Sequence, residues 1–339
     1  MNTKRLRLTS SVIAADPALL EAAAILRSGG LVAFPTETVY GLGANALDAS
    51  AVEKIFAAKQ RPHWDPVIVH VSDVATARRL TLDWPDAAEQ LAAAFWPGPL
   101  TMLLPRSAEI PDICTAGRSK AGLRLPSHPV ALALIAAAGV PIAAPSANRF
   151  GHTSPTTAEH VLADLDGRID AILDAGACTV GVESTVLDPT TTPAIIYRPG
   201  GITPEQIRLI LGDVSVAQRK ISDEVPPESL ESPGLGIRHY APRARLILVE
   251  SADELNRVLA VESSNHRVGI LLPANWPTPV ISAIILPWGN LSDPESLARE
   301  LYRQIRALDQ QEVDVILCPM PPAEGIGLAV RDRLRKAAK

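Results

Sequence analysis

The sequence has few cysteines and no cluster of them. Cys114, Cys178 and Cys318 stand far apart among 339 residues and form no C-x-x-C pair. An odd number of thiols cannot pair completely within one chain. We therefore expect reduced cysteines, as in a protein of a reducing compartment.

An excess of positive charge and a long apolar run are also missing. The formal net charge is -5, which argues against a protein that mainly coats nucleic acid, because phosphates recruit clustered Lys and Arg. A local basic groove stays open. The most apolar run, 131–145, is too short for a membrane span and contains Gly139 and Pro141. Asp16 and Pro17 interrupt any secretion signal. We expect a soluble, cytoplasmic protein without membrane contact.

Most generic nucleotide-binding and catalytic motifs are absent. The sequence contains no G-x-x-x-x-G-K-[ST], G-x-S-x-G or H-E-x-x-H motif and no EF-hand loop, which excludes a Walker-type phosphate loop. Residues 41–46 match the dinucleotide pattern G-x-G-x-x-A only formally, because a polar segment separates them from the preceding strand. We expect a tight turn at Gly41 and Gly43.

What is present predicts two domains. Composition is that of a globular protein, with 47% hydrophobic and 20% charged residues. Short apolar runs bounded by Gly or Pro alternate with helical patterns, which predicts an α/β fold. The expected strands are 31–35, 66–71, 100–105, 122–126, 140–145, 184–187 and 194–198. The expected helices are 17–27, 50–60, 86–95, 129–138 and 156–165, with another opening at 203.

The pattern changes at a polar segment with four prolines, residues 212–242, which we predict to be a linker. Apolar runs at 244–250, 266–273, 280–287 and 313–319 then alternate with helical stretches such as 296–308. The sequence thus predicts an α/β domain over 1–211, the linker over 212–242, and a smaller Rossmann-like parallel-sheet domain over 243–339.

Polar side chains gather where expected strands and helices end. In α/β sheets ligands bind beyond the carboxyl ends of strands, which favours a binding role. Taken alone, Lys59 and Arg61 are better explained as residues that cap a helix C-terminus, whereas Ser146 and Asn148 fit a turn as well as a binding site. The residues are Thr36, Glu37, Thr38 and Tyr40 after the first strand, Lys59 and Arg61 at a helix end, and Ser146, Asn148 and Ser154 after strand 140–145.

Three cationic or protonatable side chains interrupt apolar strands: His70, Arg124 and Arg198. A core histidine bonded to the backbone would explain His70 alone. A guanidinium needs an acceptor, and a ligand carboxylate would bind Arg124 bidentately. Ser184 is a neutral fourth residue of this kind. Together they are costly unless they line a polar cavity, which predicts a pocket for an anionic ligand.

Eight segments occur in the order of a known family: FPTETVYGLGANA, IFAAKQRP, FWPGPLTMLL, GLRLPSHP, VPIAAPSAN, GVESTVLD, RPGGIT and SPGLGIRHYAP. Along nearly its whole length the chain resembles the two-domain form of L-threonylcarbamoyladenylate synthase. The family's Lys-x-Arg and Ser-x-Asn signature matches Lys59, Arg61, Ser146 and Asn148. The resemblance implies a YrdC-like twisted mixed sheet with helices, plus the smaller C-terminal domain.

It also implies a reaction. L-threonine, bicarbonate and ATP would give threonylcarbamoyl-AMP and pyrophosphate. Mg²⁺ would bind through the ATP phosphates, and its protein ligands are not assigned. A downstream threonylcarbamoyl transferase machinery would use the product to modify adenosine in tRNA. Threonine would be bound by Thr38, His70, Arg124, Ala144 and Ser184, with Arg124 taking its carboxylate. ATP would be bound by Lys59, Arg61, Lys120, Ser146, Asn148, Ser154, Arg198 and Ile237.

Two residues depart from the family pattern. Ile237 stands in the linker where the family usually carries an aromatic residue, so apolar contact with the base is kept but stacking is lost. Asp65 replaces a common Asn and adds negative charge near the expected phosphates, where it could contact a metal ion. His239 and Tyr240 lie in the same linker and are expected to form a lid that excludes water.

Two further functions remain open from the residues alone. One is a double-stranded RNA-binding or translation-associated module with weak RNA contact, which the acidic balance disfavours. The other is carbamoyl-adenylate chemistry on another carbamate, as in carbamoyltransferases whose cysteine pairs this chain lacks. A purely structural role would leave His70, Arg124 and Arg198 without purpose. The basic helix after Gly325 and Gly327 is expected to be solvated and amphipathic.

Overall fold

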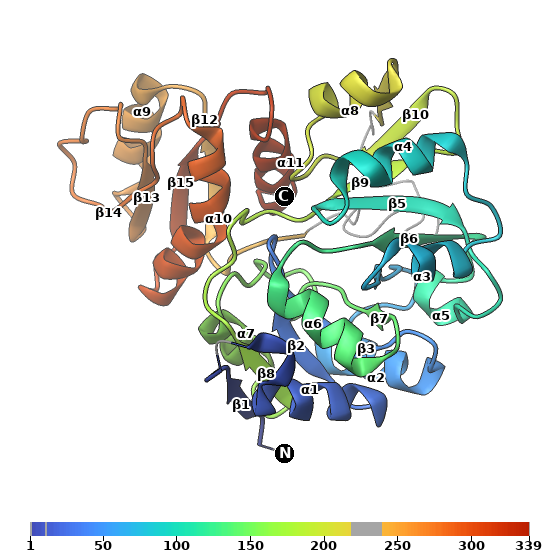
Figure 1. The fold of residues 1–339 in the computed structure, drawn as a ribbon. Coiled ribbons are helices and arrows are strands. Elements are labelled where there is room, and N and C mark those ends of the chain that lie inside the picture. The colour runs from blue at the N-terminus through green and yellow to red at the C-terminus, as the bar shows by residue number, and fades with distance from the viewer. Residues whose placement is uncertain (1, 11, 218–238, 339) are drawn as a thin grey trace.

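The computed structural model describes residues 2–10, 12–217 and 239–338 (Figure 1). The strands are β1 (Lys4–Arg7), β2 (Val32–Pro35), β3 (Tyr40–Asn45), β4 (Val69–His70), β5 (Leu100–Pro105), β6 (Lys120–Arg124), β7 (Ile142–Ala143), β8 (Ala171–Asp174), β9 (Thr185–Asp188), β10 (Ala194–Arg198), β11 (Val214–Val216), β12 (Arg245–Val249), β13 (Val268–Leu272), β14 (Ile284–Pro287) and β15 (Val315–Pro319). The helices are η1 (Ile13–Ala15), α1 (Pro17–Arg27), α2 (Ala49–Lys59), α3 (Val74–Arg79), α4 (Asp86–Phe95), α5 (Asp112–Thr115), α6 (Pro129–Ala138), α7 (Ala158–Leu165), α8 (Pro204–Leu211), α9 (Ala252–Glu262), α10 (Pro294–Gln310) and α11 (Gly327–Ala337).

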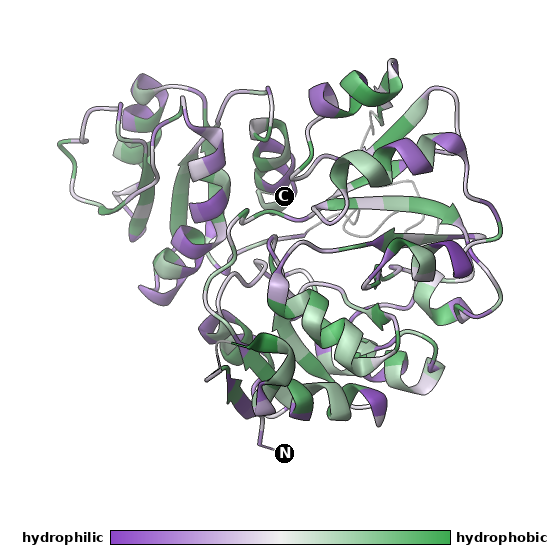
Figure 2. Ribbon diagram, in the orientation of Figure 1, coloured by the Kyte–Doolittle hydropathy of each residue, from purple (hydrophilic) through white to green (hydrophobic). Residues whose placement is uncertain are grey.

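The strands form two sheets of unequal size. The larger is mixed and has the order β1-β8-β2-β3-β7-β4-β6-β5-β9-β10-β11, and the smaller has the order β12-β15-β13-β14. All pairs in the smaller sheet are parallel. Figure 2 shows that the strands of both sheets are mainly hydrophobic, whereas hydrophilic residues gather on α9 and α10. The predicted α/β class, with a mixed sheet and a small parallel-sheet domain, is confirmed.

Local signals account for most helix boundaries. Asp16 caps α1 by accepting a hydrogen bond from the Ala18 N–H, and Pro17 occupies the first turn. Thr203 and Gln206 form a reciprocal capping box at the start of α8. The helices expected at 86–95 and 129–138 are confirmed as α4 and α6.

The tight turn expected at Gly41 and Gly43 is wrong, because both residues lie inside β3, antiparallel to β2. A Cβ atom at Gly43 would come within 2.8 Å of Phe34 and 2.9 Å of Ile142. Glycine is therefore needed for close packing across the sheet and not for a turn conformation. The turn itself lies earlier, where the Thr36 hydroxyl donates to the Val39 carbonyl at 2.7 Å.

The C-terminal domain packs directly against the larger one. Its core includes Val39 and Val182 from the larger domain beside Tyr302 and Leu334 from α10 and α11. In Figure 1, α11 lies between the two sheets. The solvated helix expected at the C-terminus is therefore wrong: α11 buries even Arg333. That charge pairs with Asp332 of the same helix and with Glu183 of the other domain, and local sequence does not reveal the second partner.

Two further expectations concern solvent and thiols. In the described part of the chain, no helix combines the length and apolarity needed to cross a membrane. All three cysteines are buried and unpaired, as expected. Burial raises the pKa of Cys114 and of Cys178 to about 12, so neither thiol is a reactive nucleophile.

Candidate functional site

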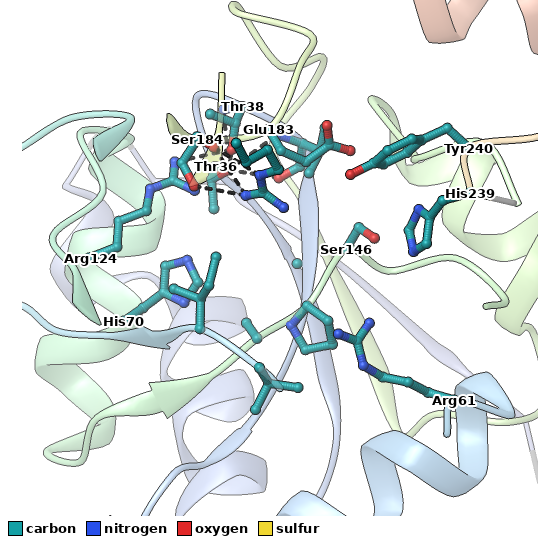
Figure 3. A pocket seen from close by; sticks show the side chains of 17 residues that line it. Thr36, Thr38, Arg61, His70, Arg124, Ser146, Glu183, Ser184, His239 and Tyr240 are labelled. Atoms are coloured by element: carbon teal, nitrogen blue, oxygen red, sulfur yellow. Dashed lines mark hydrogen bonds between the residues drawn. The ribbon is translucent and has the colours of Figure 1, made fainter. Parts of the chain in front are cut away.

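Side chains from several strand ends converge on one small cavity of about 50 Å³ (Figure 3). The prediction that His70, Arg124 and Arg198 share a single cavity is confirmed. His70 and Arg124 are direct partners in the paired strands β4 and β6, and Arg198 ends β10. The cavity is lined by Thr36, Thr38, Val39, Gly41, Arg61, Val67, Ile68, His70, Arg124, Ala144, Pro145, Ser146, Glu183, Ser184, Arg198, His239 and Tyr240.

Arg124 forms a buried ion pair that sequence reasoning did not anticipate. Its Nη2 donates to Glu37 Oε1 at 2.7 Å and to Thr38 Oγ1 at 3.0 Å. Burial works to raise the pKa of Glu37, but the Arg124 charge outweighs it and holds that pKa below its ordinary value. Arg124 Nε and Glu37 Oε2 are buried without hydrogen-bond partners, so this pair keeps one donor and one acceptor for a ligand.

His70 is a neutral imidazole. Burial, followed by the nearby Arg124 charge, lowers its pKa to about 3. Its Nδ1 is buried without a hydrogen-bond partner, and its ring packs edge-on against Phe34. A neutral ring can hydrogen-bond to a ligand without adding charge beside Arg124.

Arg198 and Ser184 form a second polar unit. Arg198 donates to the Ser184 carbonyl from Nε at 3.1 Å and from Nη2 at 3.0 Å, and also to Ser184 Oγ at 3.2 Å. The Ser184 hydroxyl contacts Thr101 Oγ1 at 2.8 Å. At Gly200 an added Cβ atom would come within 2.3 Å of the Ser184 backbone, so only glycine lets the chain after Arg198 pass this close.

The Lys-x-Arg and Ser-x-Asn residues play two different structural parts. Lys59 Nζ donates to the carbonyls of Ser146 and Asn148, so it holds their loop against α2. Burial, with Arg61 nearby, lowers the pKa of Lys59 well below its ordinary value. Arg61 does line the cavity. It pairs with Asp65 at 2.9 Å, so the charge of Asp65 is balanced where phosphate repulsion was expected.

Four predicted ATP-binding residues lie beside the cavity or farther away. Lys59 and Asn148 support the loop, and Asn148 donates to the His152 carbonyl at 2.8 Å. Ser154 donates to Glu183 Oε1 at 2.6 Å. Lys120 lies apart, pairing with Asp188 at 2.5 Å. Their ATP contacts stay predictions, and Ile237 lies outside the described residues.

His239 and Tyr240 cover one side of the cavity. Figure 3 shows them, with Arg61, opposite Arg124 and His70. The His239 ring packs edge-on against Phe150, with centroids 5.5 Å apart, and the backbone N–H of His239 donates to the Lys336 carbonyl of α11 at 3.3 Å. Elements of both domains therefore hold this pair in place.

Sequence reasoning missed Glu183, Tyr302 and Arg333. Glu183 faces the cavity, and its Oε2 accepts from Arg333 Nε at 2.8 Å and from the Tyr302 hydroxyl at 3.0 Å. The only sequence signal was an acid inside the apolar segment GVEST. Among residues 2–10, 12–217 and 239–338, no group of three or more His, Cys, Asp or Glu side chains could hold a metal ion.

Two family profiles match the chain. The Sua5/YciO/YrdC profile, described as telomere recombination, matches residues 24–200. A profile described as the C-terminal domain of threonylcarbamoyl-AMP synthase matches residues 202–339.

Known proteins resemble the chain over its full length. The threonylcarbamoyl-AMP synthase of Bacillus subtilis is 43% identical over 100% of this chain and 98% of its own length. That of Pyrococcus abyssi is 42% identical over 94% of this chain and 93% of its own length. The crystal structure of P. abyssi Sua5 complexed with L-threonine aligns with a TM-score of 0.90 at 38% identity, covering 100% of this chain and 98% of that one.

Proposed function

The chain belongs to the Sua5/YciO/YrdC family in its two-domain threonylcarbamoyl-AMP synthase form, and from this premise we propose that it joins L-threonine, bicarbonate and ATP into threonylcarbamoyl-AMP, releasing pyrophosphate. The observation that carries the proposal is the convergence of Arg61, Arg124 and Arg198 with neutral His70 on one cavity. The product is an activated anhydride, which a threonylcarbamoyl transferase would use to modify adenosine in tRNA.

Threonine would bind on the Arg124 side of the cavity. Arg124 Nε, still without a partner, would donate to the substrate carboxylate. The hydroxyls of Thr38 and Ser184 and the Nδ1 of His70 would bond the polar groups of threonine, and Ala144 would contact its methyl group. Glu37 would keep Arg124 in place.

ATP would lie toward Arg61 and Ser146, on the side that His239 and Tyr240 cover, with Arg198 also lining the cavity. A carbamate oxygen of N-carboxy-threonine attacks the α-phosphorus while the bond from that phosphorus to the departing pyrophosphate breaks. Both partners are anions, so fixed cations that offset their charge, and the positioning of the two reactants, would supply most of the catalysis.

Mg²⁺ would enter with the nucleotide. Glu183, which lines the cavity, and Asp65 are each already paired with an arginine. The residues therefore fit a metal ion held mainly by phosphate oxygens and water, which is the usual way Mg²⁺ is bound in ATP sites. Bound there, it would offset further phosphate charge.

His239 and Tyr240 would act as a lid. Ligand pockets commonly measure about 300–1,000 Å³, whereas this cavity measures about 50 Å³. Admitting ATP by this route would shift the pair from the contacts with Phe150 and α11 that hold it here. Deleting residues 212–339 should abolish synthesis or uncouple ATP hydrolysis from it, but it also removes Arg333. Tyr240→Ala is the sharper variant: we expect more ATP hydrolysed per product formed. An unchanged ratio would refute the lid.

The decisive experiment for the function incubates the protein with labelled threonine, bicarbonate and ATP. We expect pyrophosphate together with an acid-labile threonyl adduct of AMP, and no adduct when bicarbonate is omitted. Salt-dependent gel shifts with double-stranded RNA separate this outcome from the RNA-binding alternative. Tight RNA binding without any adduct would overturn the proposal.

A further inference from the structure

A buried carboxylate at the cavity wall is held by the other domain. Glu183 lines the cavity, yet Oε2 accepts hydrogen bonds from two side chains of the C-terminal domain, Tyr302 of α10 at 3.0 Å and Arg333 of α11 at 2.8 Å. Ser154 donates to Oε1 at 2.6 Å. The Arg333 side chain is fully buried, so this contact is a permanent part of the fold and not a surface ion pair.

The Glu183 carboxylate lies where a negative charge would oppose the binding of phosphates. Glu183 directly precedes Ser184 and faces the same cavity as Arg198, on the side proposed above for the ATP phosphates. An uncompensated carboxylate there would repel a polyphosphate strongly, because charges interact far more strongly in a protein interior than in water. Burial works to raise the pKa of Glu183, but Arg333 and then Arg198 hold it below its ordinary value. The acid is therefore ionised and needs a permanent counter-charge.

Arg333 touches three parts of the cavity wall at once. Besides Glu183, its Nη1 donates to the carbonyl of Pro199, the residue after Arg198, at 2.8 Å. Its guanidinium also lies 5.4 Å from the centroid of the Tyr240 ring, a cation–π distance. One side chain of the C-terminal domain thus ties together a cavity acid, the segment that carries Arg198, and the residue proposed as the lid.

We propose that Arg333 is a positioning residue of the synthase site: it neutralises Glu183 so that the ATP polyphosphate can bind, and it holds the Arg198 segment and Tyr240 around that position. The inference rests on the proposed function and extends it, because it gives the C-terminal domain a defined part in nucleotide binding. The domain completes the site from α11 without itself lining the cavity.

The charged and titratable neighbours make the role testable by pH. The groups that face this cluster are Arg198 of β10, His239 and Tyr240 of the linker, Tyr302 of α10, and Asp332, Arg333 and Lys336 of α11. Asp332 pairs with Arg333 and with Lys336, each at 2.8 Å, so it keeps Lys336 as a partner when Arg333 is removed. Removing Arg333 therefore leaves Arg198 as the strongest remaining cation acting on Glu183.

The test measures binding of a non-hydrolysable ATP analogue to the full-length protein by calorimetry. Arg333→Met should weaken binding about tenfold or more, since about 1.4 kcal/mol of repulsion equals one factor of ten. Adding Glu183→Gln to Arg333→Met should restore most of that loss, because the repelling charge is gone. Arg335→Met, an exposed position on the same helix, is the matched control and should leave the affinity unchanged.

A pH series adds a readout that lost packing alone would not produce. In Arg333→Met, burial should raise the pKa of Glu183 because its strongest counter-charge is gone, so affinity relative to the wild type should improve as the pH falls from 8 to 6. Arg335→Met should not show this trend. A double variant that binds no better than Arg333→Met, or a flat pH series, would overturn the proposal.

Thermal melting of each variant serves as the control for correct folding. If Arg333→Met fails to fold, Arg333→Lys replaces it: lysine keeps one charge but cannot span three contacts, so binding should weaken measurably, and wild-type affinity would overturn the proposal. Because binding of the analogue is measured without turnover, this test stays separate from the proposed function. If the wild type forms no threonyl adduct, the proposed function is wrong, and the binding test of Arg333 is read separately.

Discussion

Replacing Arg124 by methionine is the most informative single perturbation of the threonine side of the cavity. The substitution keeps an unbranched apolar stem but removes the only ion-pair partner that the structure gives Glu37 among its described residues. Both side chains are more than nine-tenths buried, with relative exposures of 5% and 7%. Glu37 would then keep a buried negative charge with no cation to balance it.

The expected loss is large. Removing one member of a buried ion pair costs about 3–5 kcal/mol, which for a domain of this size lowers the melting temperature by about 6–20 °C. Removing Glu37 and Arg124 together, as the double methionine variant, should recover most of that loss. Losing a charge-assisted hydrogen bond of about 1.5–3 kcal/mol should raise the KM for threonine about 10- to 150-fold.

The pH dependence has a defined sign. In the wild type the pKa of Glu37 lies below its unfolded value, so its stabilising effect is present above that unfolded value and is lost as the pH falls through the folded pKa. Without Arg124, burial dominates and the pKa rises above the unfolded value. The carboxylate then destabilises the variant increasingly as the pH rises from about 4.5 to 7. The difference in melting temperature should therefore shrink toward acid pH.

The assay is thermal unfolding at pH 7.5 and pH 5, together with threonine kinetics. Arg79→Met is the matched control, since Arg79 forms an exposed pair with Glu109, and such a pair is worth less than about 1 kcal/mol. The reasoning fails if Arg124→Met melts within the control's shift at pH 7.5, or if the difference stays constant at pH 5.

Three further outcomes follow from the packing and burial of single residues. Gly43→Ala should cost about 1–3 kcal/mol, seen as a lower melting temperature, because its Cβ atom would collide with Phe34 and Ile142; unchanged melting would contradict that packing. The pKa of His70, lowered to about 3, stays below its unfolded value, so acidification from pH 7.5 to 5 should favour unfolding by about 2 kcal/mol through this residue alone, and His70→Asn should remove that component. Cys114 should resist thiol reagents until the protein is denatured, and rapid labelling of the native protein would argue against its burial.

Elements with strong local signals were predictable. The strand expected at 100–105 and the helices at 86–95 and 129–138 appear with those bounds, because proline and glycine mark their ends and their apolar patterns are clear. The strand expected at 66–71 is reduced to Val69–His70. Short strands such as β1, with the sequence KRLR, were missed, since a charged edge strand shows no apolar pattern.

The cationic and protonatable residues of the cavity were predictable from the sequence, but the carboxylates that pair with them were not. His70 and Arg124 departed from the apolar strands around them, and that local contrast is enough to mark a polar cavity. Glu37 was noticed only as a polar residue after a strand. Its partner lies 87 positions away in sequence, and nothing local to either residue links them.

Local patterns and ordered motifs were enough to establish the fold class, the family and the chemical types of most cavity residues. Which charges meet depends on how the chain folds in three dimensions. Glu183 and Arg333 are 150 positions apart and belong to different domains. With 37 acidic and 32 basic residues in the chain, opposite sign does not select a partner; packing of α11 against the larger domain does, because an ion pair forms only between groups that the fold brings within hydrogen-bonding distance and shields from water.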